Sequence, residues 1–322
     1  MLDLAIVGAG AMGAHHGRVA MGLRDGRVVM VVDPDAVAGQ KLAHATRAAY
    51  TPDVSEVIGS VDAAVLAVPT PLHRSLGVPL LEAGISVLVE KPIAADVEDA
   101  RALVAAADAS GATLMVGHVE RFNPAVLELD SIVTDPIHIA ADRISPFTPR
   151  VTEGVILDLM IHDIDIVLHL MGSPAVATAS YATRTRSATE DLAVAILEFE
   201  NGSSALLTSS RIGQQKIRRL AITQPDSYVA VDLIRQDVTV HRVESAAFAR
   251  DGRPGFHQGG IVEIPFLRQS GEPLFLELQH FVECVEIGSA PKVSGRQGME
   301  ALRIALDVVA TAHAGVQDPA RS

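Results

Sequence analysis

The sequence is poor in cysteine, in aromatic residues and in positive charge, and each shortage excludes a class of protein. One cysteine among 322 residues excludes an internal disulfide and a cysteine-rich zinc site. Eight Phe, three Tyr and no Trp are too few for a surface that stacks single-stranded bases. The formal net charge of -13 has the wrong sign for binding phosphate backbones or anionic membranes. We therefore expect neither a nucleic-acid partner nor a membrane partner.

Long apolar runs are also missing. The longest stretch without a formal charge, 166–183, is interrupted by His169 and by Gly172-Ser173-Pro174, so it predicts no membrane span. The first predicted element begins at Leu2 and leaves no room for a signal peptide, and we expect a cytoplasmic protein. The lone Cys284 lies in a helical pattern, where a small buried side chain is a better interpretation than a nucleophile.

Length and hydrophobic pattern together predict two domains. A chain of 322 residues corresponds to about two domains. Residues 1–118 alternate short runs that are apolar along their whole length with segments of helical period, which is typical of parallel strands covered on both faces. The predicted fold class is α/β, a Rossmann doubly wound parallel sheet. Its predicted strands are 4–7, 27–32, 62–68, 86–89 and 113–117.

Residues 119–322 show a different pattern. A predicted helix, 154–171, is followed by β-rich runs at 176–186, 192–200, 203–211, 216–223, 228–233 and 238–243, and then by helices at 272–287 and 295–314. Strands that follow one another at hairpin spacing predict an α+β domain with a mostly antiparallel open sheet. The glycine-rich segment 251–260 is the expected mobile loop.

A glycine motif joins the first predicted strand to the first predicted helix. Gly8-Ala9-Gly10-Ala11-Met12-Gly13 has the spacing G-x-G-x-x-G. Gly8 permits a tight turn, Gly10 lets the backbone approach a pyrophosphate, and Gly13 lets the helix pack closely on the strand. Free N–H groups at the helix N-terminus favour the anion. The loop, including Ala11 and Met12, is therefore predicted to bind a dinucleotide.

An acidic residue, Asp33, ends the second predicted strand about 20 residues beyond the last glycine. A carboxylate at this position accepts hydrogen bonds from the adenosine ribose hydroxyls and repels a 2′-phosphate. The next residue is Pro34, which cannot hold a phosphate. NAD is therefore the predicted cofactor, with NADP disfavoured. The alternative for Asp33 is the N-cap of a helix that starts at Ala36.

A second motif, Glu90-Lys91-Pro92, follows the predicted strand 86–89. It lies at the carboxyl edge, where open α/β sheets bind ligands. A lysine there can lie near the nicotinamide ribose and donate a hydrogen bond to a substrate hydroxyl. Its charge favours the alkoxide-like character that develops as a hydride leaves. The alternative is a solvated surface lysine.

The third motif lies on the predicted helix 154–171. Its polar residues are spaced i, i+4, i+7 and i+11, which places them on one helical face: Asp158, His162, Asp165 and His169. A histidine, with an ordinary pKa of about 6.5, is suited to take the hydroxyl proton, and Asp158 can orient it or bind a substrate hydroxyl. Two alternatives stay open for His162, a core histidine and a metal ligand, although no third ligand is evident.

In order and spacing these motifs resemble the glucose–fructose oxidoreductase / inositol dehydrogenase (Gfo/Idh/MocA) family over nearly the whole chain. The resemblance rests on the three motifs above and on two further segments, Pro69-Thr70-Pro71-Leu72-His73 and Pro291-Lys292-Val293-Ser294-Gly295. It implies an N-terminal Rossmann domain and a second domain whose open sheet joins a homodimer or homotetramer.

The resemblance also implies roles for single residues. Lys91, Asp158 and His162 would act on a hydroxyl of a sugar or cyclitol. Four residues would lie at the cofactor: Pro69, His73, Glu90 and Arg121. Two departures from the family concern the shape of the substrate pocket. Glu153-Gly154-Val155-Ile156 replaces a run of glycines, and Met160 replaces a small residue.

The segments 120–124 and 157–163 are similar to a branch of the family that includes UDP-N-acetylglucosamine 3-dehydrogenases. A nucleotide-sugar substrate needs cations for its diphosphate. Arg143 and Arg150 are candidates in the loop region before the catalytic helix. A second group, Lys216, Arg218 and Arg219, lies on a predicted strand, where a solvated face or a subunit interface is the favoured interpretation.

The leading hypothesis is an NAD-dependent dehydrogenase that oxidises a secondary hydroxyl of a sugar, nucleotide sugar or cyclitol to a ketone. It requires Lys91 and His162, from different domains, to act at one bound nicotinamide. Two alternatives stay open: a non-catalytic protein that senses a dinucleotide or a sugar, and an enzyme that uses NAD for glycoside elimination or hydrolysis. A sensor has no need for Lys91, Asp158 and His162 together.

Overall fold

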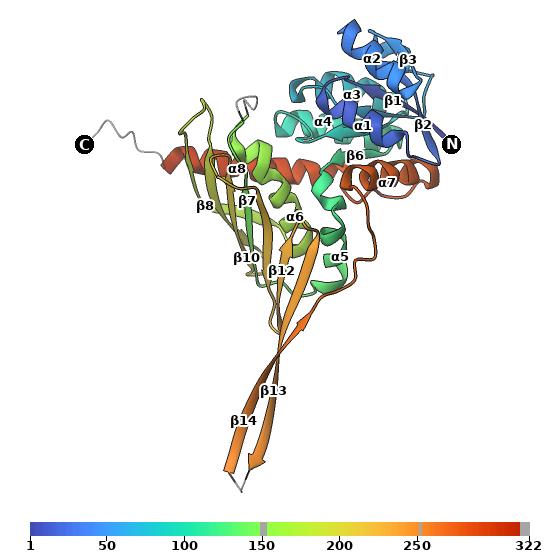
Figure 1. Cartoon of the computed structure of the whole chain (residues 1–322). Helices are drawn as coiled ribbons and strands as arrows, with labels where there is room; N and C mark the ends of the chain where they lie inside the picture. Colours follow the sequence, from blue (N-terminus) through green and yellow to red (C-terminus); the bar gives the residue numbers. More distant parts are fainter. Residues whose placement is uncertain (149–152, 251–252, 316–322) are drawn as a thin grey trace, which may run out of the picture. The chain divides into compact units, whose positions relative to one another are not determined.

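Two compact units make up the chain (Figure 1). The computed structural model describes residues 1–148, 153–250 and 253–315. Unit 1 comprises Met1–Phe122 and Gly271–Arg303, and unit 2 comprises Asn123–Ser270 and the chain from Ile304 onward. The predicted boundary at residue 118 lies close to the end of the first segment of unit 1.

Unit 1 is built on a six-stranded parallel sheet, so the predicted Rossmann fold is confirmed. The strand order is β3-β2-β1-β4-β5-β6, and it reverses between β1 and β4. The strands are β1 (Leu2–Val7), β2 (Gly26–Val32), β3 (Ala49–Thr51), β4 (Ala63–Leu66), β5 (Ser86–Glu90) and β6 (Leu114–Gly117). Every residue of β4, β5 and β6 is buried, because helices cover both faces of the sheet.

Four helices connect these strands: α1 (Ala11–Ala20), α2 (Ala36–Thr46), α3 (His73–Glu82) and α4 (Val97–Ser110). α1 packs with α2, and α3 packs with α4. Asp35 begins α2 as its N-cap, and its side chain accepts hydrogen bonds from the N–H groups of Val37 and Ala38. The alternative role of Asp33 as the cap of this helix is therefore wrong. The short strand β3 was not predicted, since three residues carry too little pattern.

The segment 271–303 packs in unit 1, whereas the predicted boundaries assign it to the second domain. Its helix α7 (Pro273–Ile287) lies against α1 and against the short helix η3 (Val119–Phe122). Leu278 and Phe281 of α7 are buried. The Val116 N–H donates to the Val293 carbonyl at 2.9 Å, so the chain also returns to β6. An apolar helix face finds its partner in three dimensions, and the sequence pattern does not name that partner.

Unit 2 holds an eight-stranded sheet in the order β14-β13-β12-β11-β7-β10-β9-β8. Only β7 and β10 pair in parallel, which confirms the predicted mostly antiparallel sheet. Its strands are β7 (His138–Ile144), β8 (Ala175–Thr183), β9 (Leu192–Phe199), β10 (Ser204–Ser210), β11 (Ile217–Thr223), β12 (Ser227–Asp232), β13 (Asp237–Arg250) and β14 (Arg253–Glu263). Helices α5 (Pro124–Ile132) and α6 (Ile161–Met171) pack together, and α6 also contacts β7 and β10.

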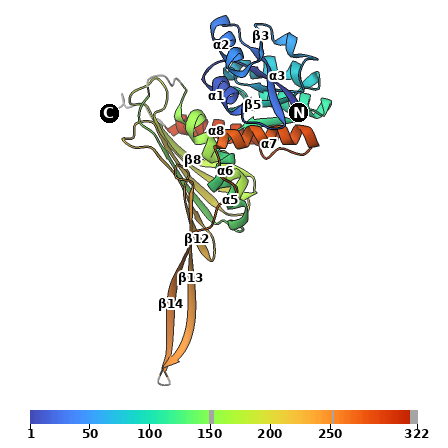
Figure 2. The same ribbon diagram turned by 45° about the vertical axis from the view of Figure 1, so that its right-hand side comes forward.

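Strands β13 and β14 form a long two-stranded ribbon in both views (Figures 1 and 2). β12 pairs with β13 only as far as Arg242, and beyond it β13 pairs with β14 alone. The expectation of a mobile loop at 251–260 is wrong for 253–260, which belong to strand β14. Residues 251–252 lie outside the described residues. Backbone hydrogen bonds between the two strands hold a glycine-rich segment that its composition alone assigns to a loop.

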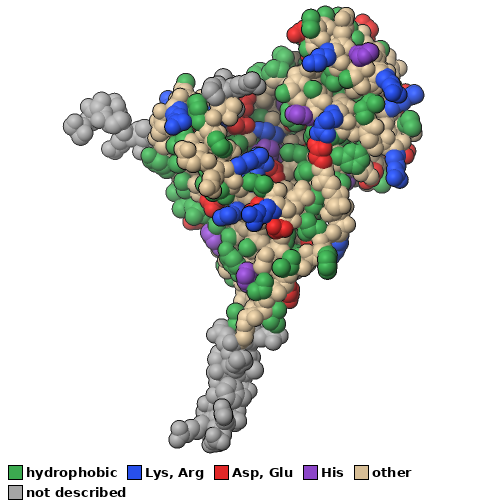
Figure 3. Space-filling view, in the orientation of Figure 1, with side chains coloured by type: hydrophobic (Ala, Val, Ile, Leu, Met, Phe, Trp, Pro, Cys, Tyr) green, Lys and Arg blue, Asp and Glu red, His purple; other side chains and the backbone are tan. Residues whose placement is uncertain are grey.

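The face of the molecule in Figure 3 shows Lys and Arg side chains among Asp, Glu and hydrophobic side chains. Such a mixed surface differs from the basic stripe that follows a nucleic-acid backbone. Across the described ranges, the structure contains no helix that is both long and apolar enough to span a membrane.

Candidate dinucleotide and substrate sites

The glycine loop has the geometry that a pyrophosphate needs. Gly8 has φ +100°, and a Cβ there would collide with the Ala67 carbonyl. A Cβ on Gly13 would collide with the Gly8 carbonyl, so α1 lies directly against the turn. At Gly10, by contrast, a Cβ would meet nothing within 4 Å, and the residue is exposed. The loop is therefore closed toward the sheet and open toward solvent, with Ala11 and Met12 exposed at the start of α1.

Asp33 joins the end of β2 to this loop. Its Oδ2 accepts a hydrogen bond from the Ala9 N–H at 2.6 Å, and its Oδ1 accepts one from the Asp35 N–H at 2.7 Å. Each carboxylate oxygen has a second acceptor position. Asp33 also lines a cavity of about 650 Å³ together with Gly8, Gly10, Pro34 and Pro69. This placement matches a carboxylate that accepts hydrogen bonds from ribose hydroxyls.

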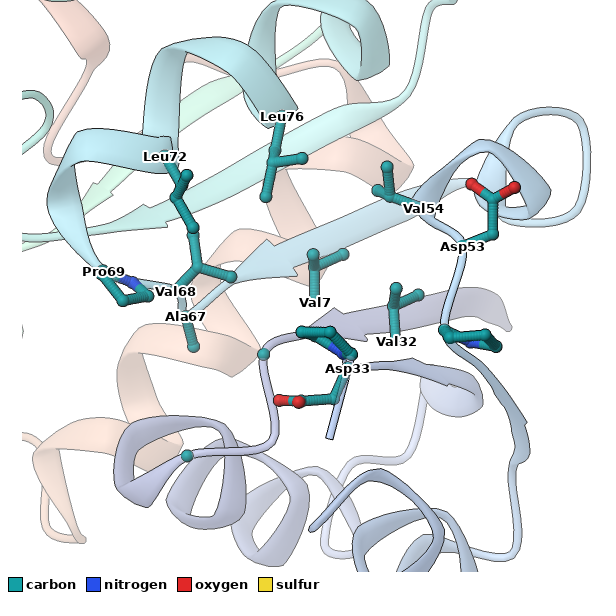
Figure 4. A pocket seen from close by; sticks show the side chains of 14 residues that line it. Val7, Val32, Asp33, Asp53, Val54, Ala67, Val68, Pro69, Leu72 and Leu76 are labelled. Carbon is teal, nitrogen blue, oxygen red and sulfur yellow. The ribbon is translucent and has the colours of Figure 1, made fainter. Parts of the chain in front are cut away.

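The walls of this cavity are mainly apolar (Figure 4). Val7 and Val32 end two neighbouring strands, and Leu72 and Leu76 come from the segment around the start of α3. A second carboxylate, Asp53, also lines the cavity, and the Ser55 N–H hydrogen bond lowers its pKa. Asp53 was not predicted from the sequence, because no motif surrounds it. The volume and apolar walls of the cavity suit an adenosine group. The carboxylates of Asp33 and Asp53 disfavour the added 2′-phosphate of NADP.

Lys91 lies at the carboxyl edge of the same sheet, directly after β5, and the Lys91–Pro92 peptide bond is cis. His73, which the resemblance placed at the cofactor, is buried behind this turn. Its Nδ1 lies 3.1 Å from the carbonyl oxygens of Pro92 and Ile93, and its Nε2 lies 3.0 Å from that of Val68. Burial lowers the pKa of His73, although the backbone carbonyls at its two ring nitrogens act in the opposite direction. In this structure it orders the backbone after Lys91.

Two other predicted cofactor residues are buried in unit 1. Glu90 ends β5, and its Oε1 lies 2.7 Å from Nε2 of His16. Arg121 lies on η3 and donates a hydrogen bond to the Lys292 carbonyl at 3.3 Å. Both side chains therefore contact the interior of unit 1, and their contact with a cofactor stays a prediction.

In unit 2, Asp158 and His162 come from two kinds of helix. Residues Ile156–Met160 form a π-helical turn, η4, and α6 begins at Ile161. The prediction of one continuous α-helix over 154–171 is therefore wrong at the turn that carries Asp158. Asp158 and His162 are both partly exposed. π-turns alter the angular spacing of side chains and are frequent at functional sites.

The other two residues of the predicted polar face are His169, which pairs with another side chain, and Asp165, which is buried. His169 lies 2.6 Å from an Asp130 oxygen on α5, and Asp165 is 2% exposed. A residue that the sequence analysis missed, Arg211, lies with its Nη2 3.6 Å from Asp158 Oδ2 and is 4% exposed. The only signal for Arg211 was its place at the end of a predicted strand.

The structure also shows which of the described candidate cations for a diphosphate are exposed and which are buried. Arg143 is 1% exposed and forms a two-pronged ion pair with Asp163, at 2.8 Å and 2.7 Å, so its assignment to a diphosphate is wrong. Arg150 lies outside the described residues. Lys216 and Arg219 are exposed, and Arg218 is partly exposed. Among the described side chains, no group of three or more His, Cys, Asp and Glu could hold a metal ion.

Comparison with known proteins identifies both parts of the chain. Residues 2–118 match the family described as "Oxidoreductase family, NAD-binding Rossmann fold", and residues 126–223 match the "GFO/IDH/MocA C-terminal domain". The chain belongs to the Gfo/Idh/MocA family. As a member of this family it is an oxidoreductase with an NAD-binding domain.

Relatives within the Gfo/Idh/MocA family match over almost their whole length. The UDP-N-acetylglucosamine 3-dehydrogenase of Acidithiobacillus ferrooxidans is 28% identical over 97% of this chain and 97% of its own. Its solved structure superposes with a TM-score of 0.87 over 98% of this chain and 99% of that one, at 27% identity. The inositol 2-dehydrogenase of Rhizobium meliloti is 27% identical over 93% of each chain.

Proposed function

We propose that this protein oxidises a secondary hydroxyl of a nucleotide sugar, a UDP-N-acetylhexosamine-like substrate at C3, to a ketone. The observation that carries the proposal is the presence of Lys91, Asp158 and His162 in a chain that matches the A. ferrooxidans 3-dehydrogenase over 97% of its length. A simple sugar or a cyclitol is the broader class, to which the R. meliloti relative points.

Gly8, Gly10 and Asp33 would hold NAD, which when bound would supply the acceptor for the hydride of the substrate carbon. His162 accepts the proton of the substrate hydroxyl, since a neutral imidazole can act as a general base. Asp158 orients His162 or the substrate, and Arg211 holds the Asp158 carboxylate at 3.6 Å. The Lys91 ammonium donates a hydrogen bond to the same oxygen and stabilises the negative charge that grows on it.

The cofactor is NAD rather than NADP. Asp33 and Asp53 both line the cavity for the adenosine end, and Pro34 offers no donor for a 2′-phosphate. Two carboxylates close to a phosphate of the same charge disfavour it in a partly enclosed cavity.

A substrate panel tests the activity. The protein is incubated with NAD and with UDP-N-acetylhexosamines, free sugars or inositols, while the absorbance of the reduced nicotinamide is followed. We expect reduction of NAD with a UDP-N-acetylhexosamine, and loss of most turnover in Lys91→Ala. Tight NAD binding without turnover on any member of the panel would support the sensor instead. Release of an aglycone without net reduction would support the elimination or hydrolysis alternative.

We also infer a homodimer or homotetramer formed through the open sheet of unit 2. Ile196 pairs across β9 and β10 with Leu206, and both are exposed, at 41% and 39%. Tyr181 and Val176 on β8 are exposed on the same sheet face, at 58% and 56%. Exposed apolar side chains that adjoin across strands are typical of an interface. Ile196→Asp should shift the mass measured by light scattering toward the monomer, whereas Val37→Asp in unit 1 should not.

A further inference from the structure

Behind the Lys91 turn, unit 1 encloses ionisable side chains that the proposed chemistry does not use. His16, one turn into α1 after the glycine loop, is 0% exposed. Its Nε2 lies 2.7 Å from Oε1 of Glu90, whose side chain is 11% exposed. A buried hydrogen bond between an imidazole and a carboxylate at this distance is short and strong.

A second buried carboxyl group, Glu277, lies on α7, which packs against α1, the helix that carries His16. It is 0% exposed, and across the described residues neither of its oxygens has a hydrogen-bond partner. Burial raises the pKa of Glu277 well above its ordinary value, and the charge of Glu90 raises it further. Burial without a hydrogen-bond partner thus favours the neutral acid form of Glu277. An ionised carboxylate at this position would be buried without compensation.

The neighbouring elements supply other ionisable groups. Arg18 and His15 of α1 are exposed, and Arg18 is paired with Glu272. On η3, Glu120 and Arg121 are buried, and Arg121 donates to the Lys292 carbonyl. On α7 itself, His280 accepts a hydrogen bond from the Lys292 N–H, and burial lowers its pKa.

Glu90 matters because the next residue is Lys91. Glu90 forms the last register pair of β5, with Gly117 of β6. The turn that follows is anchored on its other side by His73, through the carbonyls of Pro92 and Ile93. His16 on one side and His73 on the other thus hold the short segment that presents the lysine.

We propose that His16 and Glu277 are positioning residues that act through Glu90 on Lys91. His16 fixes the Glu90 carboxylate, and Glu277 stays protonated so that the enclosed pair of carboxyl groups carries a single negative charge. The role in turnover rests on the proposed dehydrogenase function, whereas the charge state of Glu277 does not. The imidazole N–H of His16 can pair with one negative charge, that of Glu90. A second negative charge, on Glu277, would repel the Glu90 carboxylate from this position.

The charge state is tested by unfolding Glu277→Gln and the wild-type protein in urea between pH 4.5 and pH 8, without substrate. A carboxyl group held neutral only in the folded state favours unfolding as pH rises above about 4.3, by up to tenfold per pH unit. Glutamine cannot ionise. The unfolding constant of the wild type relative to Glu277→Gln should therefore rise by at least about tenfold between pH 5 and pH 7. A ratio that stays constant with pH would overturn the proposal.

Glu286→Gln is the matched control, because Glu286 lies on the same helix and is exposed. Its ratio to the wild type should not change over this pH range. If its ratio rose as steeply as that of Glu277→Gln, the effect would belong to the net charge of the protein and the proposal would fail.

The positioning role is tested at His16 on the substrate that the panel identifies. His16→Leu removes the side-chain nitrogen that meets Glu90, and kcat should fall about tenfold or more because Lys91 is misplaced, while the Kd of NAD stays within a few-fold. His16→Gln keeps an N–H donor near the position of Nε2 and should restore most of kcat. Equal loss in both variants, or loss through NAD binding alone, would contradict positioning. If no substrate is turned over by the wild type, the dehydrogenase proposal fails, and the urea titration still decides the state of Glu277.

Discussion

The candidate site of unit 1 consists mainly of backbone, whereas that of unit 2 consists of side chains. In unit 1 the cofactor cradle consists mostly of backbone at the ends of parallel strands, with glycines where a Cβ would collide. In unit 2 charged side chains from separate elements form ion pairs: Arg211, just after β10, with Asp158, and Arg143 of β7 with Asp163 of α6. Backbone sites leave a short sequence motif, because one loop forms them. Sites made from distant side chains leave no such motif.

The largest expected effect tests whether unit 2 contains the acid–base group. His162→Ala should lower kcat by about 10²- to 10⁴-fold and leave the Kd of NAD within a few-fold, because a general base is lost while the cradle in unit 1 is intact. Steady-state kinetics and NAD titration measure both quantities. His169→Ala is the control, since His169 is paired with Asp130 instead. An equal loss in the control would contradict the assignment.

The next effect tests whether buried charges hold unit 2 together. Arg143→Met should destabilise the protein by about 3–5 kcal/mol, because the Asp163 carboxylate loses its ion-pair partner in the interior. Urea unfolding measures this loss. The double variant Arg143→Met/Asp163→Leu should recover a large part of it, since no lone charge is left buried. A double variant as unstable as the single one would show that shape, and not charge, is what the pair provides.

A related prediction concerns acid stability in unit 2. Asp191 is 0% exposed and accepts hydrogen bonds from the N–H groups of Thr185, Arg186 and Ser187, which lower its pKa below the ordinary value despite burial. A lowered pKa stabilises the fold above about pH 4 and loses that contribution as pH falls further. Asp191→Asn should therefore cost about 1.5–3 kcal/mol at pH 7 and less at pH 3, as measured by unfolding at each pH. A destabilisation by Asp191→Asn that is the same at pH 3 and pH 7 would contradict this prediction.

The smallest expected effect concerns the preference of unit 1 for NAD over NADP. Asp33→Ala should weaken NAD about tenfold and reduce the preference over NADP, because the ribose hydroxyls lose a charged acceptor. Asp53→Ala should change the preference less, since Asp53 caps the short helix Val54–Val57, whereas Asp33 contacts the glycine loop through the Ala9 N–H. Isothermal titration with both cofactors measures the two ratios. An unchanged preference in Asp33→Ala would remove this residue from cofactor choice.

Much of unit 1 was predictable from local pattern. Apart from β3, the strands, the glycine loop and the position of Lys91 after β5 follow from apolar runs and turn residues, and they lie close to where the pattern placed them. The π-turn at Asp158 was not predictable, because the apolar period on either side fits an ordinary α-helix. Strand β7 was missed as well, because Arg143 interrupts its apolar residues; in the structure Arg143 is buried in an ion pair with Asp163 on α6.

The sequence by itself determined the cofactor domain, since G-x-G-x-x-G and the acidic residue about 20 positions later are local features with a local physical cause. Only the tertiary structure decided which charged residues are available for chemistry. It buried Arg143 against Asp163, brought Arg211 to Asp158, and returned α7 to unit 1 so that Glu277 lies near Glu90. The reason is that the state of an ionisable group depends on its burial and its neighbours, and distant parts of the chain supply both.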